Sequence, residues 1–527
     1  MLGGAKYRFF DTLDRTARLS RARAHDAMVV GDRHQDFGTL RDRALRLANA
    51  LIGLGVAPGT RVGVLMGNRL EWPEALFAIA AAGGVCVPIN VLLRGFEVGY
   101  VIEDSDVAVL IVDSRGEAAL AELPVMPSTV IIVGDVEVPA GISRLLRYED
   151  VVEGGSALPT GVSIGIEDAV MTYYTSGTTG VPKGATHSHQ GLMWNTLHQI
   201  FDLGIRPEDR YLVVPSLSWA AGFHDIVLPL MWSGGTNVLM PTGEVTVERI
   251  VDQIIEHRIT RTLLVPVLLR QLAAAPDLLA KLRNSELTWV MSGAEPIPAA
   301  LTNAVNAELP RCDVVQAYGM TEFPLISAIL RPEEAVEHAG KAGRPTSISS
   351  MAIETPEGSI VDAGQGEILV RSPATMLGYH RKPEATAEAF RDGWFHTGDT
   401  GTIDEQGFLT VTGRKKDMII SGGMNIYPRE IEDVISAALS VGEFTVVGVP
   451  DERWGEVPVV ILRDGSEAVA ADILRVCDER LSSYKRPKRV ILRTEPFPRT
   501  PTGKLLKREL SPWAAEQVTG TAAAEGN

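Results

Sequence analysis

The sequence predicts an α/β protein with a large N-terminal domain of βα sheets, a small β-barrel-like subdomain and a small α+β C-terminal domain. Helical and strand periodicities alternate from residue 38 to about residue 350, as in sheets that are covered by helices. Beyond residue 350, short strands separated by Gly and Asp turns replace this alternation, and an α+β pattern follows from about residue 414. A chain of 527 residues is too long for one compact core, so two or more domains are expected.

The first βα units are the clearest elements. Residues 40–54 carry apolar side chains at three- and four-residue spacings, which is typical of an amphipathic helix. Residues 61–66 (RVGVLM) form a short apolar run that predicts a buried strand, and a second helix is expected over 71–82. Further strands are predicted at 85–90, 108–113, 211–216, 236–241, 260–266 and 287–293. This alternation favours parallel or mixed sheets.

The C-terminal part has a different pattern of secondary-structure signals. Its strand signals lie at 364–372, 401–413, 443–450 and 457–464. The charged segment GRKKD, at 413–417, separates two regions that carry the patterns of packed structure. We therefore predict an N-terminal domain over residues 1–412 and a C-terminal domain over residues 413–527.

Composition and charge narrow the classes of function. The formal net charge is −16, and a field of this sign repels nucleic acid and anionic lipid, so neither is an expected partner. Cys86, Cys312 and Cys477 fit neither a disulfide framework nor a zinc site. No apolar run reaches the length of a transmembrane segment. These features predict a protein of the reducing cytoplasm.

The segment YYTSGTTGVPKG, at 173–184, is the strongest local signal for chemistry. A strand-like run leads into a loop of glycines and hydroxyl residues that ends at a lysine. Backbone N–H groups and hydroxyls of such a loop suit phosphate oxygens, and the lysine adds positive charge. The spacing is not that of a Walker A loop, because Pro182 precedes the lysine. The candidate phosphate ligands are Thr175, Ser176, Gly177, Thr178, Thr179, Gly180 and Lys183.

Five more motifs follow this loop along the chain. They are SGAEPIP at 292–298, QAYGMTE at 316–322, WFHTGD at 394–399, GRKKDMIISGGMNIYPREIE at 413–432 and PRTPTGKLLKREL at 498–510. Together with the loop, they resemble the motifs of the adenylate-forming superfamily, which comprises acyl-CoA synthetases, peptide-synthetase adenylation domains and luciferases. The resemblance runs from about residue 25 to residue 510. It is greatest to fatty-acyl- and aryl-CoA ligases.

The resemblance implies a ligase that uses ATP, Mg²⁺ and coenzyme A, as in fatty acid metabolism. A carboxylate attacks the α-phosphorus of ATP to form an acyl-adenylate and pyrophosphate, and the acyl group then passes to the thiol of coenzyme A. Both reactants of the first step are anions. The enzyme must therefore position them and neutralise their charge rather than supply a nucleophile.

The motifs also assign candidate residues. Lys504 would bridge carboxylate and phosphate, Glu322 would hold Mg²⁺, and Thr178 would donate its hydroxyl to a phosphate; these three are the candidate catalytic residues. Asp399 can accept two hydrogen bonds from a ribose diol, because a carboxylate offers only acceptors. The other candidate ATP or AMP contacts are Gly293, Ala294, Glu295, Gln316, Ala317, Tyr318, Gly319, Met320, Thr321 and Arg414.

The family passes from the first step to the second by rotating its small, mobile C-terminal domain. Lys416 occupies the hinge position, among charged neighbours that tolerate solvent. Ser421, Gly422 and Gly423 would line the path of the pantetheine arm of coenzyme A, since glycines allow a ligand to approach the backbone closely.

The region that would bind the acid departs from the family. Many relatives carry a Pro-x-x-His element here, whereas residues 213–225 read VVPSLSWAAGFHD. His224 is displaced from the usual place, and is either a polar group of the pocket or a histidine satisfied within the core. The candidate pocket residues are Trp219, Phe223, His224, Met320 and Leu325. They predict an apolar acid, with a fatty-acyl chain and an aryl ring left as alternatives.

Other functions stay open at this point. A stand-alone adenylating enzyme would load the thiol of a carrier protein in trans, because no carrier domain follows residue 510. An adenylate-binding regulator is less favoured, because Lys504, Asp399 and Glu322 are all present. No feature points specifically to a luciferase. A homodimer is implied by the resemblance alone.

Overall fold

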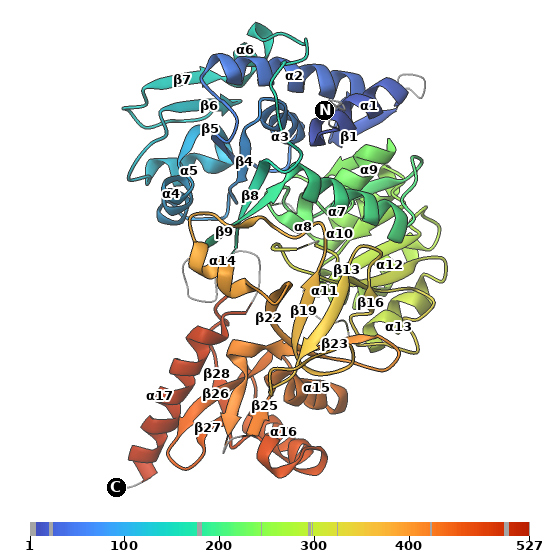
Figure 1. The fold of residues 1–527 in the computed structure, drawn as a ribbon. Helices are drawn as coiled ribbons and strands as arrows, with labels where there is room; N and C mark the ends of the chain where they lie inside the picture. Colours follow the sequence, from blue (N-terminus) through green and yellow to red (C-terminus); the bar gives the residue numbers. More distant parts are fainter. Residues whose placement is uncertain are drawn as a thin grey trace. The chain divides into compact units, whose positions relative to one another are not determined.

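The computed structural model describes residues 7–20, 25–175, 182–243, 245–293, 297, 299–323, 325–421, 424–499 and 505–525 (Figure 1). Internal contacts divide the chain into two units. Unit 1 comprises Met1–Met351 and Val370–Phe395, and unit 2 comprises Ala352–Leu369 and His396–Asn527. By contacts, residues 352–369 and 396–412 thus group with the C-terminal part of the chain. The boundary at residues 412 and 413 remains a prediction about the hinge.

Unit 1 contains a nine-stranded sheet in the order β16-β15-β14-β13-β12-β10-β11-β1-β2. The strands from β1 to β14 in this order are parallel, and antiparallel strands lie at both edges. The bounds are β1 (Asp26–Val30), β2 (Arg33–Asp36), β10 (Arg210–Val213), β11 (Thr236–Leu239), β12 (Arg261–Leu263), β13 (Trp289–Gly293), β14 (Asp313–Tyr318), β15 (Ala328–Leu330) and β16 (Arg344–Pro345). The parallel centre confirms the predicted βα alternation.

A second sheet of unit 1 has eight strands in the order β20-β9-β8-β4-β3-β5-β6-β7. It is parallel from β8 to β7, and β9 is antiparallel to both of its neighbours, β8 and β20. The bounds are β3 (Arg61–Leu65), β4 (Val85–Pro88), β5 (Val107–Asp113), β6 (Thr129–Val133), β7 (Arg144–Arg147), β8 (Ala169–Thr175), β9 (Lys183–Ser188) and β20 (Gly378–Tyr379).

Helices cover these sheets, and one core cluster joins residues from both sheets with α1, α2, α3 and α9. Helix α2 begins where Asp36 caps it, because this carboxylate accepts hydrogen bonds from the N–H groups of Gly38 and Thr39. Every residue of α3 is buried. The bounds are α1 (Phe9–Ser20), α2 (Phe37–Gly53), α3 (Glu71–Ala81), α4 (Gly95–Asp104), α5 (Glu117–Ala121), α6 (Tyr148–Gly154), α7 (His189–Asp202), α8 (Ala220–Phe223), α9 (Val227–Ser233), α10 (Val247–Glu256), α11 (Pro266–Ala273), α12 (Pro276–Leu282), α13 (Ala299–Glu308) and α14 (Pro383–Ala389).

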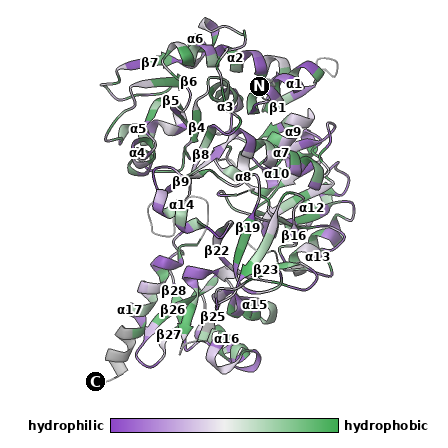
Figure 2. Cartoon of the chain, in the orientation of Figure 1, coloured by the Kyte–Doolittle hydropathy of each residue, from purple (hydrophilic) through white to green (hydrophobic). Residues whose placement is uncertain are grey.

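Unit 2 contains a sheet in the order β25-β24-β27-β26, with β28 beside β27, and the apolar character of β26 and β27 is visible in Figure 2. Its bounds are β24 (Ile419–Ser421), β25 (Met424–Ile426), β26 (Phe444–Asp451), β27 (Gly455–Arg463), β28 (Val490–Arg493), α15 (Pro428–Ala438), α16 (Glu467–Arg480) and α17 (Lys507–Glu525).

A further sheet has the order β18-β17-β19-β22-β21, with β23 beside β22. Its bounds are β17 (Ser350–Glu354), β18 (Ile360–Val361), β19 (Gly364–Arg371), β21 (Phe390–Arg391), β22 (Trp394–Ile403) and β23 (Leu409–Arg414).

Among the described residues, no helix combines the length and the hydropathy that crossing a bilayer requires. The elements of both units together confirm the predicted α/β class.

His189 begins helix α7 and is fully buried. Burial lowers the pKa of its imidazole to about 4, with smaller and partly opposing effects from Asp168 and Arg8. The unfolded chain, whose histidines have a pKa near 6.5, therefore takes up a proton at a higher pH than the folded protein does. The stability that depends on neutral His189 is complete above pH 6.5 and is lost as the pH falls towards 4.

We expect His189 alone to lower the free energy of unfolding by about 2 kcal/mol between pH 7 and pH 5. In the His189→Leu variant this contribution is absent, so the slope of stability against pH becomes shallower in that range. Guanidinium unfolding midpoints, followed by tryptophan fluorescence from pH 7.5 to pH 5, measure the slope independently of the absolute stability. Equal slopes in the two proteins would contradict the assignment.

Candidate functional site

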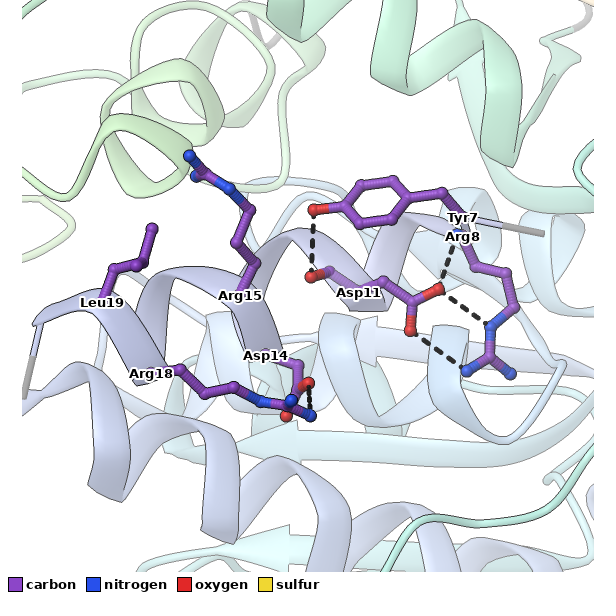
Figure 3. Close-up of a pocket in the computed structure, with 7 residues that line it drawn as sticks. All are labelled: Tyr7, Arg8, Asp11, Asp14, Arg15, Arg18 and Leu19. Carbon is purple, nitrogen blue, oxygen red and sulfur yellow. Dashed lines mark hydrogen bonds and ion pairs between the residues drawn. The ribbon is translucent and has the colours of Figure 1, made fainter. Parts of the chain in front are cut away.

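A surface depression of about 490 Å³ lies along helix α1 (Figure 3). Two ion pairs lie among its charged side chains: Arg8 binds Asp11 at 3.1 Å, and Arg18 binds Asp14. The lining residues are Tyr7, Arg8, Asp11, Asp14, Arg15, Arg18 and Leu19. None of them belongs to a motif that predicts chemistry; those motifs lie at the ends of the strands.

Strands β8 and β9 frame the predicted phosphate loop. β8 ends at Thr175 and β9 begins at Lys183, and these two residues face each other in the antiparallel register. A hydroxyl and an ammonium group therefore flank the two ends of the loop. The other predicted phosphate ligands, Ser176, Gly177, Thr178, Thr179 and Gly180, lie outside the described residues.

The carboxylate of Glu322 is held beside this loop. The residue is only 7% exposed, and its Oε1 accepts hydrogen bonds from the hydroxyl of Thr175 at 3.3 Å and from that of Tyr379 at 3.1 Å. The ammonium group of Lys183 lies 5.1 Å from the centroid of the Tyr379 ring. A carboxylate with hydroxyl oxygens around it is a donor set of the kind that Mg²⁺ accepts. The structure thus brings together three predicted residues, Thr175, Lys183 and Glu322, from two separate motifs.

Tyr379 was missed by sequence reasoning. It lies in β20, which pairs with β9 in a register that places Tyr379 opposite Ala185. Its hydroxyl reaches Glu322 across 57 residues of sequence. An aromatic residue in a turn-rich segment between two motifs gives no periodic signal, so only the pairing of β20 with β9 reveals it.

The predicted adenine segments lie at the carboxyl ends of two parallel strands. β13 and β14 are neighbours, with Ser292 opposite Gln316 and Gly293 opposite Ala317. A Cβ at Gly293 would lie 2.8 Å from the carbonyl oxygen of Ala317, so this close approach requires glycine. Ligands of α/β proteins bind at such strand ends. Ala294 and Glu295 lie outside the described residues.

The segment after β14 turns sharply. A Cβ at Gly319 would lie 1.9 Å from the carbonyl oxygen of Leu325, which excludes any larger residue there. Tyr318, Met320 and Thr321 are half-buried beside this turn. The turn therefore carries the backbone from the adenine segment to Glu322.

In unit 2, Asp399 and Arg414 face each other across β22 and β23. The Nε of Arg414 lies 2.6 Å from Oδ1 of Asp399, and Asp399 is only 5% exposed. The backbone N–H of Asp399 donates to the hydroxyl of Thr397 at 3.0 Å. The carboxylate is therefore held by a neighbouring cation within its own sheet, as a positioned hydrogen-bond acceptor should be.

The predicted hinge follows Arg414 directly. Lys415–Asp417 form a single 3₁₀ turn, in which burial lowers the pKa of Lys416. The ammonium group of Lys415 binds Glu367 at 2.7 Å, close to Glu354 and His396, so the chain itself supplies a cation to this acidic cluster. Ser421 is buried at the end of β24. Gly422, Gly423 and Lys504 lie outside the described residues.

The predicted acid-binding residues divide between surface and core. Trp219 precedes α8 and is half-buried, as are Met320 and Leu325. Phe223 is fully buried, with its ring centroid 4.7 Å from that of Trp72 in α3. Phe223 and His224 are both buried beneath this region.

The sequence profile of AMP-binding enzymes matches residues 14–380 of the chain. The chain belongs to the AMP-binding enzyme family. A second profile, for the C-terminal domain of these enzymes, matches residues 430–504. The family therefore covers both units, and the resemblance drawn from the six motifs is confirmed.

Individual relatives are acid–CoA ligases. The chain is 34% identical over 483 residues to the long-chain-fatty-acid–CoA ligase FadD13 of Mycobacterium tuberculosis, covering 91% of this chain and 93% of that protein. The structure of the anthranilate CoA ligase AuaEII with anthranoyl-AMP matches with a TM-score of 0.85 at 28% identity, covering 98% of each chain. The o-succinylbenzoate–CoA synthetase MenE of Bacillus subtilis, with ATP and magnesium, matches with a TM-score of 0.81 at 28% identity, covering 95% of this chain and 98% of that one.

Proposed function

We propose that this chain is an ATP-dependent acid–CoA ligase of the AMP-forming kind. ATP, Mg²⁺ and coenzyme A are its cofactors, as the family and its relatives indicate. The observation that carries the proposal is the position of Glu322, whose carboxylate shares hydrogen bonds with Thr175 at the end of β8 and with Tyr379. A carboxylate in this position supports a divalent cation bound near the phosphates that the segment 173–184 would hold.

The first step requires two anions to meet. Residues 175–180 and Lys183 would bind the phosphates of ATP, and Mg²⁺ held through Glu322 would neutralise their charge. The half-buried turn from Tyr318 to Thr321 would contact the adenine and the α-phosphate. Lys504 would bridge the carboxylate of the acid and the α-phosphate as the negative charge shifts to the leaving pyrophosphate.

Unit 2 would hold the ribose and serve the second step. Asp399 would accept hydrogen bonds from the ribose diol, with Arg414 keeping its carboxylate oriented. Lys416 would be the hinge between domains 1–412 and 413–527, and residues 421–423 would admit the pantetheine arm. No side chain of the protein need attack the adenylate, since the thiol of coenzyme A is the nucleophile.

The acid we propose has an apolar body, either a fatty-acyl chain or an aryl ring. The half-buried Trp219, Met320 and Leu325 support this, and the relatives include both substrate types. The cysteine usage supports a cytoplasmic location, and the family resemblance alone supports a homodimer. Light scattering after size exclusion tests the dimer.

Acid-dependent exchange of labelled pyrophosphate into ATP tests the proposed function. We expect exchange with fatty or aryl acids, weaker exchange with acetate, and none with amino acids. Thioester formation with coenzyme A is then compared with that on a phosphopantetheinylated carrier protein. Absence of exchange across the whole panel would overturn the enzyme assignment, and transfer only to the carrier would overturn coenzyme A as the acceptor.

A further inference from the structure

The chain turns in an unusual way immediately after His224. Ile226 has φ 67° and ψ −43°, and the N–H of Val227 donates to the carbonyl oxygen of Asp225 at 2.7 Å. This is a γ-turn of the rarer hand, with ideal angles of about +75° and −65°. A β-branched residue at positive φ is strained, and such strain persists where the surroundings enforce it, often at ligand-binding sites.

A buried glutamine enforces this turn. Gln199, on helix α7, is fully buried. Its Nε2 donates to the carbonyl oxygen of His224 at 3.0 Å, and its Oε1 accepts from the N–H of Ile226 at 3.0 Å. One side-chain amide therefore holds the backbone on both sides of Asp225, including the carbonyl group of His224.

The imidazole of His224 stands against two other polar side chains. Its ring centroid is 5.1 Å from that of Tyr173 on β8 and 6.2 Å from that of His187 on β9, both nearly perpendicular. Burial lowers the pKa of His224 well below its usual value, and that of His187 to about 4, so both rings are neutral. A neutral imidazole offers one donor and one acceptor.

Three polar atoms of this cluster are buried without a hydrogen-bond partner among the described residues. They are Nε2 of His224, Nε2 of His187 and the hydroxyl oxygen of Tyr173. Leaving one such atom unsatisfied is costly, and three adjacent groups are rare without a ligand or ordered water. An apolar core would not place them together.

The cluster adjoins the proposed reaction site. Tyr173 lies two residues before Thr175 on β8. The backbone of Thr321, which precedes Glu322, is near enough to His187 to raise its pKa slightly against the larger effect of burial. The three side chains therefore stand next to the segments that we propose to bind ATP and the acid.

We propose that Tyr173, His187 and His224 form a polar subsite that binds an oxygen substituent, a hydroxyl or keto group, on the apolar body of the acid, and that Gln199 positions it. This rests on the proposed function and narrows its substrate class to oxygenated acids. A site built to hydrogen-bond a substrate oxygen rejects the analogue that lacks it, because its own polar groups are then left unpartnered.

Pyrophosphate exchange with matched acids tests the subsite. The pairs are 3-phenylpropionate with 3-(4-hydroxyphenyl)propionate, and octanoate with 8-hydroxyoctanoate and 7-oxooctanoate. We expect kcat/KM to favour an oxygenated acid of at least one pair by about 10- to 100-fold in the wild-type enzyme. In Tyr173→Phe and His224→Phe this ratio is expected to fall towards 1.

Two further variants distinguish a positioning role of Gln199 from a non-specific effect of removing a buried polar group. Gln199→Leu is expected to reduce the ratio through KM for the oxygenated acid, since it releases the turn without removing a subsite atom. Tyr148→Phe, which removes a buried hydroxyl bonded to Glu74, should leave the ratio unchanged. Tyr173→Phe removes one oxygen only, so it decides the matter even where His224→Phe does not fold.

The outcomes distinguish the two proposals. No exchange with any acid would overturn the proposed function itself. Exchange with equal kcat/KM for all plain and oxygenated partners would leave the ligase intact and overturn the subsite, and would mean that water satisfies the cluster. A preference that survives both Tyr173→Phe and His224→Phe would overturn the assignment to these residues.

Discussion

Glu322→Gln is expected to slow acid-dependent pyrophosphate exchange by about 100- to 1,000-fold, because a coordinating charge next to the phosphates is worth several kcal/mol of transition-state stabilisation. Glutamine has nearly the same shape and can still accept hydrogen bonds from Thr175 and Tyr379 through its amide oxygen. The loss would therefore report the charge rather than the packing. Initial rates over a range of Mg²⁺ concentrations measure it, and the concentration for half-maximal rate should rise.

Tyr379→Phe is the matched control for Glu322. It removes one hydrogen bond to the same carboxylate oxygen but leaves the charge in place, so we expect a loss of only about 3- to 10-fold. A Glu322→Gln enzyme with normal exchange and unchanged Mg²⁺ dependence would show that this carboxylate does not serve the metal. An equal loss in both variants would point to the geometry of the hydrogen bonds instead.

Lys416→Pro is expected to separate the two half-reactions. Proline fixes φ at residue 416 and also disfavours the helical conformation of Lys415, which lies with it in one 3₁₀ turn. If the backbone at this position must rotate between the steps, pyrophosphate exchange should stay within about 3-fold of the wild type while thioester formation falls about 100-fold. Single-turnover formation of acyl-CoA from isolated acyl-adenylate measures the second step alone.

Lys416→Ala controls for the loss of the side chain. It keeps the freedom of the backbone, so both half-reactions should proceed at close to wild-type rates if the residue acts as a hinge. Normal thioester formation by Lys416→Pro would show that the hinge lies elsewhere. Equal slowing by alanine and proline would mean that the ammonium group, and not the backbone, serves the second step.

Local patterns predicted the elements that meet at the site. Apolar runs such as 61–66 and 287–293 are the strands β3 and β13, because short buried strands need continuous apolar sequence whatever their neighbours. The motif 316–322 likewise lies on β14 and the turn after it. The close approach of Gly319 to Leu325 requires a glycine, and that glycine is visible in the sequence. These features are encoded within a few residues of one another.

Contacts between distant segments could not be predicted in the same way. Tyr379 reaches Glu322 only because the two-residue strand β20 pairs with β9, and a strand this short has no period to detect. In the sequence, Gln199 is an ordinary polar residue of a helix. Its hydrogen bonds to the backbone of the turn at Ile226 depend on how α7 packs. Whether His224 was a pocket or a core residue was open for the same reason.

The sequence by itself determined the α/β class, the membership of the AMP-binding enzyme family and the order of the motifs that would carry the two-step reaction. Such features depend on periodicity and on residue types at close spacing, which a chain displays before it folds. Only the tertiary structure decided that Tyr379 accompanies Thr175 at Glu322 and that Gln199 holds a strained turn beneath three buried polar groups. Hydrogen bonds and burial depend on which distant segments become neighbours, and that is settled by packing.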